Sequence, residues 1–471
     1  MTDFKNETGT PENNIDDNFV ERVRGVRNAL SIHGRLEVEE RDLTGHVKQR
    51  WLHTESQTPI LIIPPGQSDS FFAHYVRGWR QVLSDSFMPV GFPHSVSDDY
   101  LAYQTYDSLQ AFFSTITALL ANRALLVGLG VGDANSSATF AMLLTIFKDG
   151  LSRIATIVFA NRFGLRIEPD AKRYRFLADV LNDTAFFLEL YSPFLGPLAK
   201  TLALSVGEAL RALCGVAAGA SKAALSVHFA KHDNLAELNT KEASQETAVG
   251  LVGLLVGSVV VKYVEEPWTV VYLMTFLVFT HLLVNYLGVC SVVMDTLNRQ
   301  RATIVFDEYF KTGNILSPRE AAKRENILFY SNALRNPHGR VVARLSFATN
   351  YKQVFMVDSA KMLSVDGDRF SLLVVPKSGT TAISIVLYEG AHAEDIILAW
   401  YTGMVAAYDM DSSSDNARAT LPADVLRKVA TKKEELFRGM ERVGWDLTRA
   451  QDFETSAPMR VRFHAASKKD E

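Results

Sequence analysis

The sequence predicts a mainly α-helical protein, in which a polytopic helical membrane bundle is followed by a small C-terminal α+β domain. The first observation is the segment from Pro267 to Met294, which contains no Asp, Glu, Lys or Arg. Because a helix of about 20 apolar residues crosses a hydrocarbon core of about 30 Å, this segment is long enough to span a bilayer. The second is the uneven distribution of charge. Charged residues concentrate in 1–110 and 295–471, although the whole chain is 47% hydrophobic and 22% charged, with a net charge of −4.

The N-terminal region is polar and divides into two parts. Residues 1–30 begin with an acidic stretch without hydrophobic periodicity, which predicts a disordered tail. Residues 31–100 contain short alternating runs, which predict strands and loops, and a periodic segment that predicts an amphipathic helix over Phe71–Phe87. The start of the chain lacks the basic-then-apolar order of a secretory signal, so we expect internal spans to direct membrane insertion.

Residues 101–300 form the predicted membrane domain, with about six spans arranged as three helical hairpins. The spans are expected at 112–132, 138–160, 184–206, 209–228, 247–264 and 268–294. The loop that follows the second span is rich in Arg and Lys, which favours the cytosolic side of a membrane. Both termini are then also cytosolic, and a lipid bilayer is the expected partner. A soluble protein with a very apolar helical core is the alternative.

Charged residues inside these helices are the first candidates for a site, because each charge at the bilayer midplane costs about 2.5–3.5 kcal/mol on insertion scales. Asp149 and Arg153 are four residues apart, acid first, so they can pair along one helical face. A structural ion pair and a polar binding site are both compatible with that spacing. Asp179 and Asp183 also share a helical face. They either bind a cation or relay protons, or they pair with the neighbouring arginines.

A polar stretch from His228 to Glu246 is richer in reactive side chains than a connector needs. His228 and His232 are four residues apart and could share a metal ion with Asp233. Because the spacing fixes no third ligand, we predict no metal site.

The last apolar segment carries one polar face, formed by His281 and Asn285. Gly250, Gly253 and Gly257 in the preceding span would let another helix approach closely. Packing against these glycines would turn the polar face inward, towards the charges of the second span. The face would then form one wall of a site.

Four stretches carry a resemblance to a known family. They are Pro-Val-Gly-Phe-Pro-His-Ser-Val at 89–96 with Asp-Tyr-Leu-Ala-Tyr-Gln at 99–104 and Asp-Ser-Leu-Gln at 107–110; Asp170 to Asp183; His228 to Thr247; and Asn285-Tyr286 with Thr296 to Ala302. Their order and length resemble the root UV-B sensitive family, also described by its vitamin B6 photo-protection and homoeostasis domain, over about 70–330. The resemblance implies a membrane protein linked to vitamin B6 homeostasis that forms complexes with other family members or with itself. It implies no catalytic mechanism.

Residues 301–465 predict the small α+β domain. Strands are expected at 340–347, 370–375, 381–388 and 459–463, with a hairpin turn at 376–379, and helices are expected at 302–311, after Ser317, around Trp400 and over 422–443. The basic residues near the C-terminus are few and interleaved with acids, so we predict no nucleic-acid binding.

The sequence offers no defensible catalytic constellation: we find no Ser-His-Asp order, Cys-His pair, dinucleotide fingerprint or P-loop lysine. We therefore predict a non-enzymatic protein without a cofactor, which binds or transports a small polar metabolite. The alternatives are a membrane scaffold that recruits partner proteins through its C-terminal domain, and an enzyme that uses His228 as a base beside Asp233 and Glu242. The candidate ligand-binding or transport residues are Arg123, Asp149, Arg153, Asp179, Asp183, His228, Asn234, Lys241, Glu242, Gln245, Glu246, His281 and Asn285.

Overall fold

The computed structural model describes residues 35–41, 47–54, 57–61, 79, 82–128, 138–331, 333–336, 338–350, 361–364, 369–377, 380–412, 423–449, 453 and 459–462. These residues divide into two compact units. The first takes the described part of Met1–Val96 together with Lys231–Lys241, and the second takes that of Ser97–Ala230 and Glu242–Glu471.

The first unit contains an antiparallel sheet, as the alternating runs predict. Its strands β1 (Arg35–Arg41), β2 (Val47–Thr54) and β3 (Gln57–Leu61) are hydrogen-bonded in chain order. Residues 82–87 are helical, in agreement with the end of the predicted amphipathic helix. The predicted tail at 1–30 and most of residues 71–81 lie outside the described residues.

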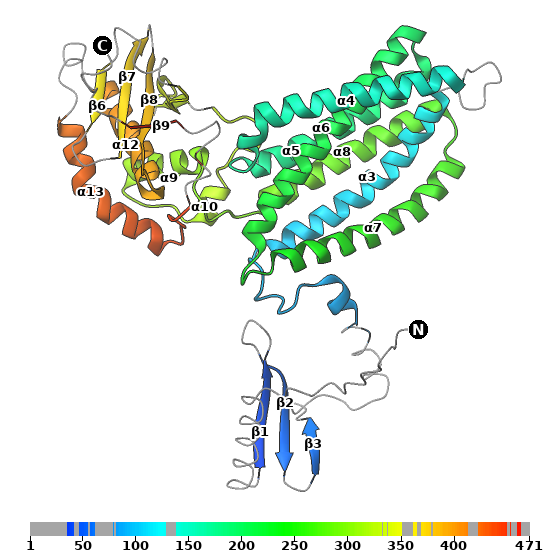
Figure 1. Cartoon of the computed structure of the whole chain (residues 1–471), viewed down its shortest axis with the longest axis horizontal. Helices are drawn as coiled ribbons and strands as arrows, with labels where there is room; N and C mark the ends of the chain where they lie inside the picture. The colour runs from blue at the N-terminus through cyan, green and yellow to red at the C-terminus, as the bar shows by residue number, and fades with distance from the viewer. Residues whose placement is uncertain are drawn as a thin grey trace, which may run out of the picture. The chain divides into compact units, whose positions relative to one another are not determined.

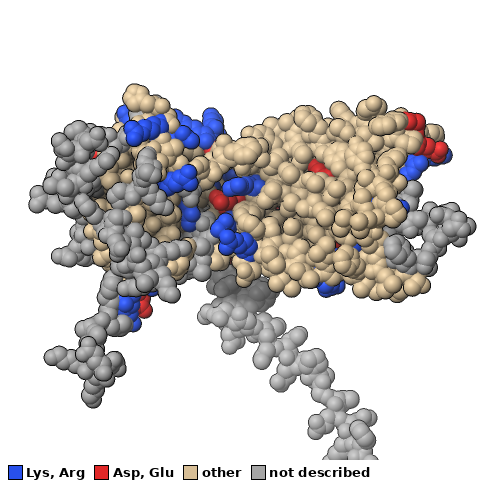
Figure 2. Space-filling view, turned by 90° about the horizontal axis from the view of Figure 1, so that it is seen from above, with Lys and Arg blue, Asp and Glu red and all other residues tan. Residues whose placement is uncertain are grey.

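The second unit begins with a bundle of long helices that lie alongside one another (Figure 1). They are α3 (Tyr100–Gly128), α4 (Ala138–Ile167), α5 (Ala171–Tyr191), α6 (Pro197–Phe229), α7 (Leu235–Tyr263) and α8 (Pro267–Ser291). Helix α5 packs along α6 and α3, α8 packs on α3, and α4 packs on α6. The bundle face in Figure 2 is almost free of charged side chains. On the surface of the bundle, large apolar side chains such as Ile157, Leu255 and Phe279 are more than half exposed. Such exposure is typical of a surface that faces lipid rather than water.

Glycines let two of these helices approach closely. A Cβ atom at Gly257 would lie 2.5 Å from Leu119 Cδ1, and one at Gly253 would lie 2.9 Å from Thr115 Cβ. Helix α7 therefore contacts α3 through its small residues. The predicted role is right for Gly253 and Gly257 but wrong for Gly250, where a Cβ atom would have no neighbour within 4 Å, and the partner of these glycines is α3 and not the helix that carries His281. The His281 face contacts α3 and α5 rather than the charges of the second span.

In the part of the chain that the structure describes, four helices, α3, α6, α7 and α8, are long and apolar enough to cross a membrane. The prediction of about six spans is thus confirmed only in part, because α4 and α5 carry too many charges along their length. The predicted third and fourth spans, 184–206 and 209–228, are wrong in their boundaries. Helix α5 ends at Tyr191, a 3-10 turn follows at Ser192–Phe194, and α6 then runs unbroken from Pro197.

The reason for this difference lies at Gly207 and Glu208, where the sequence predicts a turn. Gly207 is a helical residue that lets α6 approach Ala185 and Leu188 of α5. Glu208 forms an ion pair with Lys148 of α4, in which Oε2 and Nζ are 3.6 Å apart. A small residue and a charge inside an apolar run thus reflect helix packing rather than a chain reversal. The predicted polar loops are also largely helical, since α4 extends to Ile167 and α7 begins at Leu235.

The C-terminal domain is α+β, as the sequence predicts. Its described strands are β4 (Ala333–Arg335), β5 (Val341–Phe347), β6 (Lys361–Ser364), β7 (Phe370–Lys377), β8 (Thr380–Tyr388) and β9 (Arg460–Val461). They form one sheet in the order β4-β5-β8-β7-β6, with β9 also paired to β8. The β5–β8 and β8–β9 pairs are parallel, and β7 and β8 form the predicted hairpin.

Helices cover this sheet and join it to the bundle. They are α9 (Arg299–Thr312), α10 (Pro318–Ala322), α12 (Ala393–Ser412) and α13 (Ala423–Arg442). Ser317 and Glu320 form the expected capping box at the start of α10. Trp400 on α12 is fully buried in the core between sheet and helices, where its indole Nε1 donates to Thr303 Oγ1 at 3.2 Å.

Candidate binding site within the helical bundle

A network of buried polar side chains connects α3, α5 and α8. Its centre is Arg175, whose guanidinium is enclosed by the bundle. It donates from Nη2 to Asp107 Oδ1 at 2.6 Å and to Gln110 Oε1 at 2.8 Å, and from Nη1 to Asp179 Oδ2 at 3.1 Å. Its Nε also donates to Tyr103 Oη at 3.3 Å. One fork-shaped cation therefore holds acceptors from two helices.

The network continues from α5 to α8 through His281 and Asn285. His281 Nδ1 lies 2.8 Å from Asp183 Oδ2, and its Nε2 lies 3.0 Å from Gln110 Nε2. Asn285 Nδ2 donates to Asp179 Oδ2, which also accepts from Gln110 Nε2 at 2.7 Å. The i,i+4 spacings on α5 and α8 bring all four of these predicted residues, the two Asp and the His and Asn, into one place.

Protonation of the network follows from these contacts. The amide nitrogen of Gln110 can only donate, so His281 Nε2 accepts and a neutral imidazole carries its proton on Nδ1, where it is donated to Asp183. Three carboxylates then share the network with one cation, Arg175, which contacts Asp107 and Asp179 but not Asp183. The second oxygen of Asp183, Oδ1, is buried without a hydrogen-bond partner in the described part of the chain. Uncompensated negative charge of this kind is expensive to bury, so a proton or a cationic group is needed to balance it.

The other predicted site residues do not join this network. Asp149 and Arg153 are exposed on α4, and no ion pair connects them. The pairing hypothesis is therefore wrong, and it is Lys148 on the same helix that forms an ion pair, with Glu208 of α6. Arg123 donates to the carbonyl oxygens of Val261 and Val264, so it caps the end of α7.

The residues from the polar stretch before and within α7 have separate contacts. Asn234 donates to Ser95 O at 3.1 Å and Lys241 donates to Asp85 O, both within the first unit. Glu246 is exposed and accepts from Lys222 Nζ at 3.1 Å, while Gln245 is half-buried. Glu242 is buried, and its Oε1 lacks a hydrogen-bond partner among the described residues.

His228 forms a second cluster at the ends of the helices. Its Nε2 lies 3.0 Å from Asp99 Oδ2 and its Nδ1 lies 3.6 Å from Asp295 Oδ1. Asp99 also accepts from Val293 N at 2.6 Å. The adjacent His228 imidazole holds the pKa of Asp295 below its ordinary value. His228 thus clamps the start of α3 to the segment after α8. Within the described residues no group of three or more His, Cys, Asp or Glu side chains is arranged to hold a metal ion.

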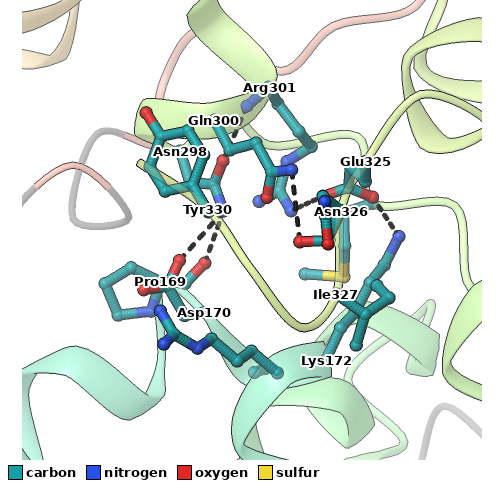
Figure 3. Close-up of a pocket in the computed structure, with 13 residues that line it drawn as sticks. Pro169, Asp170, Lys172, Asn298, Gln300, Arg301, Glu325, Asn326, Ile327 and Tyr330 are labelled. Carbon is teal, nitrogen blue, oxygen red and sulfur yellow. Dashed lines mark hydrogen bonds and ion pairs between the residues drawn. The ribbon is translucent and has the colours of Figure 1, made fainter. Parts of the chain in front are cut away.

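A buried ion-pair junction joins the bundle to the C-terminal domain (Figure 3). Glu325 lies between Lys172 of α5 and Arg301 of α9, and its Oε1 is 3.0 Å from Arg301 Nη1. Burial alone would raise the pKa of Glu325, but the two adjacent cations hold it below its ordinary value. Asn298 caps α9 through Arg301 N at 2.8 Å and donates to Pro169 O at 2.8 Å.

Sequence reasoning missed Tyr103, Asp107, Gln110 and Arg175 as members of the network. A signal was present, because each lies in a stretch that carries the family resemblance, at 99–104, 107–110 or 170–183. Arg175 is one of the neighbouring arginines that the spacing offers as partners for Asp179 and Asp183, and the structure shows that it organises the network.

Together, these features define a class of protein: a bundle with apolar helices of membrane-spanning length, a charge network at its centre, and an appended α+β domain. A family model described as "Vitamin B6 photo-protection and homoeostasis domain" matches residues 74–313. The chain belongs to this family, the root UV-B sensitive family.

Curated relatives support this membership. "RUS family member 1" of Dictyostelium discoideum is 41% identical over 256 residues, which cover 54% of this chain and 49% of the relative. "Protein root UVB sensitive 3" of Arabidopsis thaliana is 29% identical over 344 residues, 71% of this chain and 77% of the relative. The chain thus spans about half the length of the Dictyostelium relative. No solved structure matches the chain.

Proposed function

We propose that the helical bundle binds a small polar metabolite and moves it across a membrane without altering it chemically. Vitamin B6 vitamers are the class to test first, because the family is described by vitamin B6 homoeostasis. The observation that carries the proposal is the network of three carboxylates around one arginine, enclosed by helices α3, α5 and α8. Polar and ionisable groups at such a position commonly mark a substrate or proton pathway.

The charge balance of the network points to the kind of metabolite. Asp183 Oδ1 is buried and lacks a hydrogen-bond donor among the described residues. A ligand with a protonated amine or pyridinium would supply both a donor and the missing positive charge. Among the B6 vitamers, pyridoxamine offers an amine and a ring that can be protonated, whereas pyridoxine lacks the amine.

The proposal can be tested by uptake of labelled pyridoxamine and pyridoxine into liposomes that contain the purified chain. We expect uptake by the wild type, with pyridoxamine preferred, and strongly reduced uptake by Asp183→Asn. Glu265→Gln, an exposed change in the turn before α8, is the matched control and should transport normally. If correctly inserted wild-type protein neither binds nor takes up any vitamer, B6 is not the substrate class. If Asp183→Asn transports like the wild type, the network is not the site.

A second candidate function is a membrane scaffold that associates with copies of itself or with other family members. The observation in its favour is the complete pairing of Arg175, which donates to four side chains and so can serve to hold helices together. A scaffold should keep its partners in Asp183→Asn, since that change leaves these four contacts in place. Co-purification of differently tagged copies, compared between wild type and variant, distinguishes the two functions.

A further inference from the structure

An arginine-lined cleft opens where the bundle meets the C-terminal domain, away from the buried network. Its volume is about 1300 Å³ when its open mouth is included. Its lining side chains come from α4, α5, α9 and β5, and those that matter here are Phe163, Arg166, Arg173, Tyr174, Arg299 and Arg344. Figure 2 shows Lys and Arg side chains gathered around this part of the molecule, in contrast to the neutral bundle face.

The cleft carries a strong excess of positive charge. Among the described residues, four arginines line it against one acidic residue, Asp170. Burial raises the pKa of Asp170, while the neighbouring Arg173, Arg301 and Arg299 act in the opposite direction, so this carboxyl offsets only part of the positive charge of the four arginines. Positive charge concentrated in a concave surface attracts and focuses anions.

The four arginines of the cleft differ in their contacts: two are held by other groups of the protein, and two have no hydrogen-bond or ion-pair partner among the described residues. Arg166 lies over the Phe163 ring with its Cζ 5.7 Å from the ring centroid, and Arg299 donates from Nε to Phe453 O at 2.9 Å. Arg173 and Arg344 are exposed and have no ion pair within 4.0 Å and no side-chain hydrogen bond among the described residues. Guanidinium groups without a hydrogen-bond or ion-pair partner among the described residues, placed beside fixed ones, are suited to bidentate recognition of a phosphate.

Aromatic side chains form the rest of the wall. Phe163 and Tyr174 face the cleft from α4 and α5, and Tyr330 also lines it. The Tyr330 hydroxyl is buried and lies close to Thr303. Burial raises the pKa of Tyr330 to about 12, so the phenol stays protonated and able to donate. A planar or apolar group attached to a phosphate can therefore contact rings while the phosphate contacts arginines.

We propose that this cleft is a binding site for a phosphomonoester, in which Arg173 and Arg344 contact the phosphate and the aromatic wall contacts the group that bears it. The site is distinct from the transport site, because Arg173 and Arg175 lie two residues apart and so on nearly opposite faces of α5. The phosphomonoester can come from a soluble metabolite or from a lipid headgroup such as that of phosphatidic acid.

The experiment measures binding of two soluble probes to the full chain in detergent micelles, by isothermal titration. Pyridoxine 5′-phosphate is the phosphomonoester probe, chosen because it lacks the aldehyde that would react with lysines, and pyridoxine is its phosphate-free counterpart. A parallel arm measures association of the chain in nanodiscs with and without phosphatidic acid, read as protection of the cleft from an arginine-directed reagent. The test variant is R173A/R344A, and R162A/R319A removes the same charge from two exposed arginines outside the cleft.

We expect pyridoxine 5′-phosphate to bind at least about ten-fold more tightly than pyridoxine, because charge-assisted hydrogen bonds to the phosphate are strong. R173A/R344A should weaken binding by about ten-fold or more, while R162A/R319A should bind like the wild type. Protection of Arg173 and Arg344 by phosphatidic acid alone, without protection of the exposed Arg162 and Arg319, also supports the phosphate site and identifies a lipid source. The proposal is overturned if neither phosphate compound binds, or if both double variants lose the same affinity. Failure here leaves the transport proposal untouched, since that proposal is read out by uptake and Asp183.

Discussion

Replacement of Arg175 by alanine should destabilise the bundle more than any other single change in the network. The guanidinium contacts Tyr103, Asp107, Gln110 and Asp179, and all five side chains are buried. Its removal leaves the two carboxylates that it contacts, Asp107 and Asp179, without their cation. Loss of one partner from a buried ionic network typically costs about 3–5 kcal/mol. Because 1 kcal/mol shifts the melting temperature of a domain of 150–250 residues by about 2–4 °C, we expect a fall of about 6–20 °C.

The assay is thermal unfolding of the purified chain in one detergent, followed by fluorescence-detected gel filtration of the surviving monodisperse fraction. Arg175→Lys keeps the charge but loses the forked geometry, so it should lie between the alanine variant and the wild type. Arg162→Ala, an exposed change on α4, is the control and should melt within about 2 °C of the wild type. If Arg175→Ala melts like the control, the network does not hold the helices together and the assigned contacts are incorrect.

Other predictions concern helix packing and the junction. Gly253→Ala should lower the melting temperature because its Cβ would meet Thr115, whereas Gly250→Ala should be tolerated, since nothing lies within 4 Å of a Cβ there; equal melting of the two variants would refute the close α3–α7 contact. Glu325→Gln should cost about 3–5 kcal/mol at neutral pH, because two buried cations lose their partner. The pKa of Glu325 is held below its ordinary value of 4.5 in the folded state. Its contribution to stability is therefore fully present above about pH 4.5 and is lost as the pH falls through the folded pKa. Unfolding between pH 3 and 7 should show a steeper acid loss for the wild type than for Glu325→Gln, and parallel curves would contradict the assignment.

The helices of the bundle could be predicted from the sequence as apolar runs, but several of their ends could not. Hydrophobicity marks residues that avoid water, whereas a helix end depends on caps and on packing. Pro193 and Pro197 bracket the real break after α5, and Pro197 occupies the first turn of α6. In the sequence Gly207 resembles a helix break, but in the structure it is a helical residue that allows α6 to pack closely on α5.

The site could be predicted in part, through spacing within single helices. Asp179 with Asp183, and His281 with Asn285, share helical faces, and each pair does line the network. Which helices face one another is decided by tertiary packing, so the partners of these pairs were not predictable from spacing. Spacing within a helix can also mislead. Asp149 lies four residues before Arg153 on α4, but Asp149 is on the exposed face of the helix and does not join the network.

Helix α6 contains 33 residues and is therefore about 50 Å long, about 20 Å longer than a typical hydrocarbon core. In a bilayer such a mismatch is relieved by tilt, or by extension of one end into the headgroup and water layers. The end that bears His228, clamped between Asp99 and Asp295, is the polar one. A bilayer would thus be expected to leave this end of α6 above its surface. The clamp would then lie in water, where it would set the level at which the chain leaves the membrane for its C-terminal domain.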